Sequence, residues 1–327
     1  MLRGYNRSMK IRGALAALCV LGIAVWAQQP PAQKLPQQQT KPPVDQTDEL
    51  TRITVDVTRV DMLFTVTDKK GKFVTGLGRD DFEVFESKKP QVIQEFAAES
   101  NLPLRLAVLV DTSNSIRDRF RFEQEAASEF LKEVILPNQD KAMVVSFDTS
   151  PELKADLMDD TDKLDKAIRD LRPGGGTALY DAIYFACRDK LQQDQPRHKF
   201  RRAIVLLSDG EDNQSRYTRD QALEMAQKAD VVVYAISTNI SHIESDGDKV
   251  LKYFTSETGG RAFFPFKVED MGQDFTDIHN ELRHQYNVSY RPEPLLTDGL
   301  FHTIEMRVKG HKEYIVHARK GYYARKM

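Results

Sequence analysis

Apolar residues follow two different rhythms along the chain. They alternate with polar residues at positions 53–57 and 62–66, and again after Gln285 at 286–290, 304–308 and 314–318. A period of two predicts antiparallel strands with one buried face. Each end has too few strands to be stable alone. We therefore expect residues 49–102 and 286–327 to form one small antiparallel β-sandwich, with two unrelated edge additions as the alternative.

The stretch between them, residues 103–285, has continuous apolar runs at positions 106–110, 143–147, 204–207 and 231–236. Such runs are typical of strands covered on both faces. Segments with helical spacing separate them, as at Phe122, Ala126, Phe130 and Val134. Alternating strands and helices predict a doubly wound, mostly parallel α/β sheet. This α/β domain is expected to be inserted in the sandwich or flanked by it.

The first residues have the pattern of a targeting signal. Four basic residues precede an apolar run at 13–27, which is shorter than the roughly 20 residues that span a bilayer. Residues 1–27 are therefore predicted to be a cleaved signal peptide, and the chain to be secreted or periplasmic. An uncleaved signal would instead leave it membrane-anchored. Residues 28–48 are rich in Gln and Pro and are predicted to be a linker.

Charge and cysteine content narrow the possible partners. The 327 residues carry a formal net charge of -2 without a basic stripe, so a nucleic-acid partner is not expected. The basic pairs at 319–320 and 325–326 are interpreted as a solvated end. Cys19 lies in the predicted signal, which leaves Cys187 as a buried apolar residue on a helix and excludes an internal disulfide.

Polar residues follow the buried runs at the places where a doubly wound sheet binds ligands. Asp111, Ser113 and Ser115 come directly after the first run, Asp209 follows the third, and Thr177 ends a glycine-rich loop. Each could be a helix cap or a turn residue. Together they deliver only oxygen ligands to one edge of the sheet, which favours Mg²⁺ or Mn²⁺.

This constellation resembles the metal-ion-dependent adhesion site of von Willebrand factor type A domains, over about residues 103–285. The flanking β segments are similar to bacterial secreted proteins related to this domain. The resemblance implies that Ser113 and Ser115 bind the metal directly and Thr177 directly or through water. Asp111 and Asp209 would act largely through water. It also implies an open metal position filled by an Asp or Glu carboxylate of a protein partner.

Enzymatic alternatives fit the sequence less well. A phosphatase of the haloacid dehalogenase type needs a second acid where Ser113 stands, and a phosphate-binding loop needs a lysine before Thr177. The Gly-x-Ser-x-Gly pattern of serine hydrolases is absent around Ser113. Glu211 and Asp212 are interpreted as solvated acids, with a supporting role next to the metal ligands as the alternative. We therefore expect an exported, non-enzymatic binding module, with a Mg²⁺-dependent hydrolase or a structural subunit without a working metal site as alternatives.

Overall fold

The computed structural model describes residues 59–98, 102–114, 117, 120–239, 241, 243–265, 267, 270–324 and 326. The chain divides into two compact units, Met1–Gln46 and Thr47–Met327, and all described residues belong to the second. The predicted signal peptide, the linker and the predicted strand at 53–57 lie outside the described residues. None of the helices within these ranges is both long and apolar enough to cross a membrane.

A six-stranded sheet forms the centre of the α/β domain, in the order β10-β9-β8-β5-β6-β7. The four predicted runs are β5 (Leu104–Asp111), β6 (Lys141–Phe147), β8 (Arg201–Ser208) and β9 (Val231–Ser237), and they pair in parallel with the short β10 (Ala262–Phe263). The edge strand β7 (Pro151–Met158) is antiparallel to β6 and was not predicted. Its side chains are mostly exposed or half-buried, so it has no buried run to reveal it.

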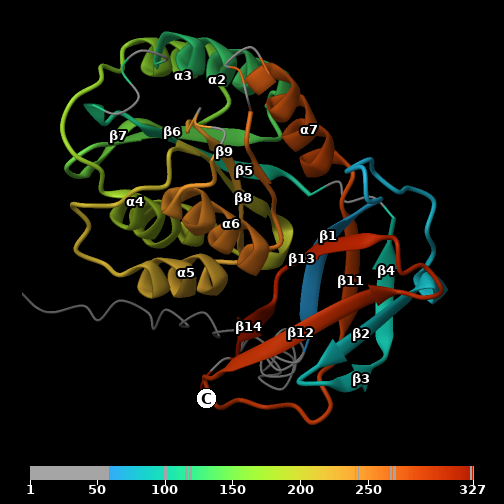
Figure 1. Cartoon of the computed structure of the whole chain (residues 1–327). Coiled ribbons are helices and arrows are strands. Elements are labelled where there is room, and N and C mark those ends of the chain that lie inside the picture. The colour runs from blue at the N-terminus through green and yellow to red at the C-terminus, as the bar shows by residue number, and fades with distance from the viewer. Residues whose placement is uncertain are drawn as a thin grey trace, which may run out of the picture. The chain divides into compact units, whose positions relative to one another are not determined.

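Helices cover both faces of this sheet (Figure 1). One face packs against α2 (Phe120–Val134), α3 (Thr161–Arg169) and α7 (Met271–Arg283). The other packs against α4 (Leu179–Phe185), α5 (Arg219–Lys228) and α6 (Asp246–Thr258). Short helical turns are η1 (Arg79–Asp81), η3 (Ala186–Lys190), η4 (Leu191–Gln193) and η5 (Arg197–Lys199).

Cys187 and Phe122 were both predicted to be buried on helices, and the structure buries only the first. Cys187 is fully buried, as expected, although it lies in the turn η3 that continues α4. Phe122 is 53% exposed, which contradicts its place in the predicted apolar stripe of α2. The buried face of α2 instead includes Phe120, Ala127 and Leu131. A strict four-residue spacing drifts around a helix of 3.6 residues per turn, so the predicted stripe left the core at its start.

The sandwich contains two four-stranded antiparallel sheets, in the orders β13-β1-β11-β4 and β14-β12-β2-β3. Strands before the α/β domain are β1 (Val60–Thr67), β2 (Phe82–Glu86), β3 (Lys89–Gln91) and β4 (Ile93–Ala97). Strands after it are β11 (Tyr286–Tyr290), β12 (Phe301–Val308), β13 (Ile315–Ala318) and β14 (Gly321–Tyr323). Each sheet combines strands from both ends of the chain around one apolar core. The predicted fold class is confirmed: a mostly parallel α/β sheet with two small antiparallel sheets.

The basic residue Arg319 contradicts the interpretation of a solvated end. Its side chain is only 15% exposed. Its guanidinium forms an ion pair with Asp230, at the start of β9, and donates a hydrogen bond of 2.6 Å to the carbonyl of Asp61 in β1. Arg319 therefore joins the α/β domain to the sandwich.

Candidate metal site

Asp111 ends β5 and is completely buried. Its Oδ1 accepts a hydrogen bond of 2.9 Å from the backbone N–H of Ser113, and its Oδ2 accepts one of 2.8 Å from the hydroxyl of Ser208. Burial raises the pKa of Asp111 to about 6, against the hydrogen bonds that lower it, and the charge of Asp209 raises it further. A buried carboxylate in this situation is stabilised by a nearby cation.

The glycine-rich loop that precedes Thr177 lies directly against the segment after β5. The N–H of Gly174 donates to the carbonyl of Thr112 over 2.6 Å. The Asn114 amide donates to the carbonyl of Gly175 over 3.2 Å. Asn114 and Gly175 are 61 residues apart in sequence. The glycine-rich loop and the segment after β5 therefore meet at the end of β5.

Thr177 is held from both sides by the loop that follows β8. Its N–H donates to Oδ1 of Asn213 over 3.0 Å, and its carbonyl accepts from the N–H groups of Asn213 and Gln214 over 2.9 and 3.0 Å. The same loop begins with the half-buried Asp209, whose Oδ1 accepts from the N–H of Glu211 over 3.1 Å. All three predicted segments thus converge at one edge of the sheet.

Four of the five predicted ligands belong to these segments: Asp111, Ser113, Thr177 and Asp209. Ser113 and Thr177 are 3% and 4% exposed, so their hydroxyls lie in a protected place rather than at a solvated turn. Ser115 lies outside the described residues. The available donors are hydroxyl and carboxylate oxygens, which fit a hard cation such as Mg²⁺. Over the described ranges, no group of three or more His, Cys, Asp or Glu residues is arranged to hold a metal.

The Asp209 turn also rests on the first turn of α6. Gly210 has a φ of +81°, and a Cβ built there would lie 2.2 Å from the carbonyl oxygen of Gly247. A Cβ on Gly247 would in turn lie 2.1 Å from the carbonyl oxygen of Asp209. Only glycine at both positions permits this approach of two backbones.

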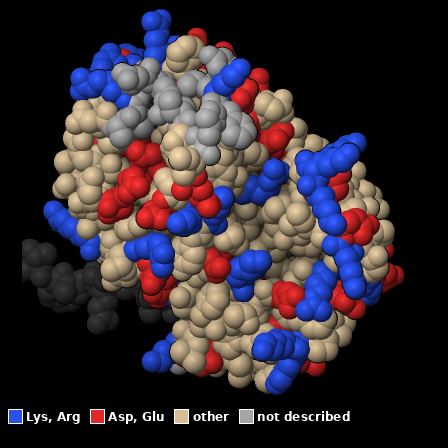
Figure 2. All heavy atoms as spheres, in the orientation of Figure 1, with Lys and Arg blue, Asp and Glu red and all other residues tan. Residues whose placement is uncertain are grey.

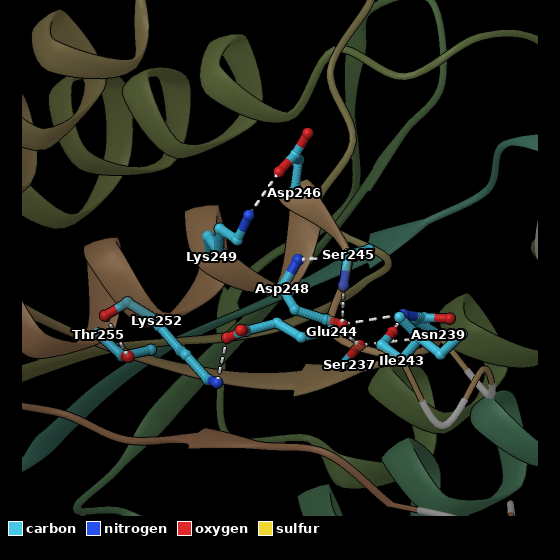
Figure 3. Close-up of polar contacts among 10 residues, drawn as sticks. All are labelled: Ser237, Asn239, Ile243, Glu244, Ser245, Asp246, Asp248, Lys249, Lys252 and Thr255. Carbon is cyan, nitrogen blue, oxygen red and sulfur yellow. Dashed lines mark hydrogen bonds and ion pairs between the residues drawn. The ribbon is translucent and has the colours of Figure 1, made fainter.

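A buried polar network fixes that turn of α6 (Figure 3). The carboxylate of Asp248 accepts hydrogen bonds from the hydroxyl of Ser237 (2.7 Å), the amide of Asn239 (2.8 Å) and the N–H of Ser245 (2.9 Å). The hydroxyl of Ser245 caps α6 by accepting from the N–H of Asp248. The network links the carboxyl end of β9 to the helix that supports Asp209.

Several residues support the site without being candidate ligands. Asp212 is not simply solvated, because its carboxylate accepts from the N–H of Tyr180, at the start of α4, and from the hydroxyl of Ser215. Glu211 is exposed, as predicted. Ser208 could have been suspected from its place at the end of the third buried run. Asn213 carries no local signal, since its role depends on a loop far away in sequence.

Comparisons with known proteins find one family match and several similar solved structures. Residues 106–211 match the family model described as the von Willebrand factor type A domain. No curated protein matches the chain. Among solved structures, the hypothetical protein BatB from Bacteroides thetaiotaomicron is 16% identical with a TM-score of 0.44, over 55% of this chain and 98% of that one.

Two other solved structures are similar over a comparable part of the chain. The PilB minor pilin from Streptococcus sanguinis is 16% identical with a TM-score of 0.45, over 56% of this chain and 62% of that one. Proximal thread matrix protein 1 from the mussel byssus is 17% identical with a TM-score of 0.48, over 61% of this chain and 50% of that one, in a structure with a zinc-occupied MIDAS motif. The family match assigns a von Willebrand factor type A domain to residues 106–211.

Proposed function

We propose that this chain is an exported protein-binding module that grips an Asp or Glu carboxylate of a partner protein through a Mg²⁺ ion. Asp111, Ser113, Ser115, Thr177 and Asp209 would hold the ion, and Mn²⁺ could replace it. The observation that carries this proposal is the fully buried Asp111 carboxylate at the place where the three loops meet. The neighbouring side chains of Ser113 and Thr177 bring hydroxyls but no positive charge.

The chemistry of these residues favours binding over catalysis. Neutral hydroxyl ligands leave a bound Mg²⁺ electrophilic, so that it can accept an outside carboxylate. Asp111 and Asp209 supply negative charge, and their hydrogen bonds to Ser113, Ser208 and Glu211 hold both carboxylates in place. Ser113 stands where a phosphatase of the haloacid dehalogenase type would need its acid. We therefore propose a non-enzymatic role.

The same proposal covers the organisation of the chain. Residues 1–27 would be a signal peptide, 28–48 a linker, 49–102 and 286–327 the two parts of the sandwich, and 103–285 the type A domain. The protein would then act outside the cytoplasm, without membrane insertion after signal cleavage. On the face shown in Figure 2, acidic and basic side chains are interspersed rather than gathered into a basic surface, which supports a protein partner over nucleic acid.

Thermal melting in EDTA and in Mg²⁺ tests the metal site. An ion that binds only the folded chain adds about 2.7 kcal/mol to the free energy of unfolding when its concentration is about 100 times its Kd. Asp111→Asn keeps an acceptor for Ser113 but removes the charge, so it should abolish the Mg²⁺-dependent rise in Tm. Asp140 is a matched control, because it is equally buried and accepts hydrogen bonds from Leu104 and Leu136 away from the site. Asp140→Asn should lower Tm but keep the rise.

Capture of the partner tests the rest of the proposal. Exported proteins should be retained by the immobilised chain in Mg²⁺ and released by EDTA, and the Asp111→Asn variant should retain none of them. Superimposed melting curves at several millimolar Mg²⁺ would contradict the metal site and favour a structural subunit. Retention that persists in EDTA would contradict the ion-bridged grip even if the metal binds. Hydrolysis of a phosphate ester that depends on Asp111 would instead support the hydrolase.

A further inference from the structure

A cavity of about 260 Å³ lies at the amino-terminal edge of the central sheet, where the type A domain meets the sandwich. Arg201 and Val231, the first residues of β8 and β9, line one side. Leu63 of β1 and Asn287 of β11 line the other. The candidate metal site is at the carboxyl ends of β5 and β8, the opposite edge of the same sheet, so the cavity is a separate feature.

Three polar atoms of the residues that line this cavity are buried without a hydrogen-bond partner. They are Nε of Arg319, Oε1 of Gln285 and Oδ1 of Asn287. Gln285 is only 3% exposed, so water outside the protein does not reach it freely. Buried polar atoms almost always have partners, and exceptions that gather in one cavity point to a ligand or ordered water. One donor and two acceptors without a partner thus belong to residues that line the same space.

The charge of the lining favours an anion. Four arginines and two aspartates line it: Arg59, Arg201, Arg202, Arg319, Asp61 and Asp230. Arg59 pairs with Asp61 and Glu95, and Arg319 pairs with Asp230, so the positive charge that remains is that of Arg201 and Arg202. Arg201 is 3% exposed and donates to the backbone carbonyls of Leu102 and Leu282. Within the described part of the chain, no carboxylate lies within ion-pair distance of it. Burial, aided by the charge of Arg283, lowers the pKa of Arg201 to about 10, as expected for a guanidinium without a close counter-charge.

Part of the wall is apolar. Leu63, Leu102, Phe200 and Val232 contribute side chains to it. A water molecule occupies about 30 Å³ in the liquid, so the volume corresponds to roughly nine waters, or to a ligand of about the size of an aromatic amino acid. The lining thus offers guanidinium donors, amide acceptors and an apolar surface to one small molecule.

We propose that this cavity binds a small organic carboxylate that also carries an amino or hydroxyl group next to an apolar body. Its carboxylate contacts the arginines, and its N–H or O–H donates to the amide oxygens of Gln285 and Asn287. The apolar body packs against Leu63 and Phe200. This site does not depend on the proposed metal-bridged function.

Four probes that share one aromatic body test the chemistry, with binding measured by calorimetry on the whole exported chain. L-phenylalanine carries the carboxylate and an amine, and 3-phenyllactate the carboxylate and a hydroxyl. 3-Phenylpropionate lacks the donor, and phenylethylamine lacks the carboxylate. Titrations are made in EDTA, so that a metal ion cannot capture the carboxylates. We expect one or both of the first two probes to bind, and the last two to bind about tenfold or more weakly, because each leaves buried polar groups unpaired.

Variants locate the binding. Leu63→Trp fills the cavity and should abolish binding of the probes, whereas Leu296→Trp, on an exposed loop that does not line it, should have no effect. If Leu63→Trp does not fold, Asn287→Leu removes one acceptor and should weaken the best probe about tenfold. Equal binding of all four probes, or binding that survives both Leu63→Trp and Asn287→Leu, would overturn the proposal. So would stabilisation by sulfate or chloride that equals that by the probes, which would indicate an adventitious ion only.

Discussion

The contact between the Asp209 turn and α6 gives a sharp prediction, because the chain contains its own control. Gly247 and Gly272 are each the second residue of a helix, α6 and α7 respectively. A Cβ on Gly272 would meet nothing within 4 Å, whereas a Cβ on Gly247 would meet the carbonyl oxygen of Asp209 at 2.1 Å. The same Gly→Ala substitution should therefore have opposite effects at the two positions.

The magnitude follows from the geometry. Ordinary contacts of a Cβ begin at 3.4 Å, so Gly247→Ala requires the two backbones to move apart by about 1.3 Å. Overpacking of this kind costs roughly 1–3 kcal/mol, while alanine gains about 0.5–1 kcal/mol over glycine in a helix. We expect Gly247→Ala to lower the free energy of unfolding by about 1–2 kcal/mol and Gly272→Ala to raise it by about 0.5 kcal/mol.

The displacement should also reach the proposed metal site. A site needs its groups held to within about 0.5 Å, so a shift of about 1 Å at Asp209 should weaken Mn²⁺ binding about tenfold or more. Urea unfolding in EDTA measures the stability change without metal, and Mn²⁺ titration followed by electron paramagnetic resonance measures the affinity. If Gly247→Ala is as stable as Gly272→Ala and binds Mn²⁺ as the wild type does, the contact with α6 does not position the Asp209 turn. A loss of stability with unchanged affinity would confine the role of the contact to folding.

Three further substitutions test other parts of the structure. Burial raises the pKa of Asp274 from 3.8 to about 7, so the folded chain holds this proton more tightly than the unfolded chain and stability falls as the pH rises from 4 to 8. Asp274→Asn should thus stabilise the fold by about 1 kcal/mol at pH 8 and by almost nothing at pH 4 in urea titrations, and equal effects at both would contradict this. Arg319→Ala and Asp230→Ala should show a coupling free energy of about 1 kcal/mol in a double-mutant cycle. Additive losses in the free energy of unfolding would mean that the ion pair does not stabilise the fold. Ser208→Ala removes a hydrogen bond to Asp111 and should cost about 1 kcal/mol and weaken Mn²⁺ binding; unchanged calorimetric titrations would assign Ser208 no part in the site.

The positions of Asp111 and Asp209 could be predicted because they follow from strand order alone. Asp111 and Asp209 come directly after buried runs, and the carboxyl ends of parallel strands lie on one edge of a sheet. Thr177 needed a further assumption, that a glycine-rich loop returns to this edge. The contacts of Gly174 and Gly175 with the segment after β5 meet that expectation.

Contacts between distant segments could not be predicted in the same way. Arg319 was misread because a basic pair near the end of a chain is usually solvated, and nothing local reveals Asp230, 89 residues earlier. The strand β7 was missed because only one face of an edge strand is buried, so its apolar residues are few. In both cases the local sequence is compatible with several structures, and tertiary pairing selects one of them.

Glycines show why the supporting parts of a site are harder to predict than its ligands. Gly210 follows Asp209 and reads locally as a turn, and Gly247 reads as an unfavourable residue in the first turn of a helix. Neither position alone indicates contact with the other. In the folded chain the two backbones lie in contact, and each occupies the space that a Cβ on the other glycine would need. This contact is the reason that both positions are glycine. Glycine at position 247 lowers the intrinsic stability of α6 but lets its first turn lie against Asp209. The hydrogen bonds to the Asp248 carboxylate hold that turn in place. A local weakness in a helix is thus the mark of a tertiary contact, and it can be recognised only once the fold has placed the two segments together.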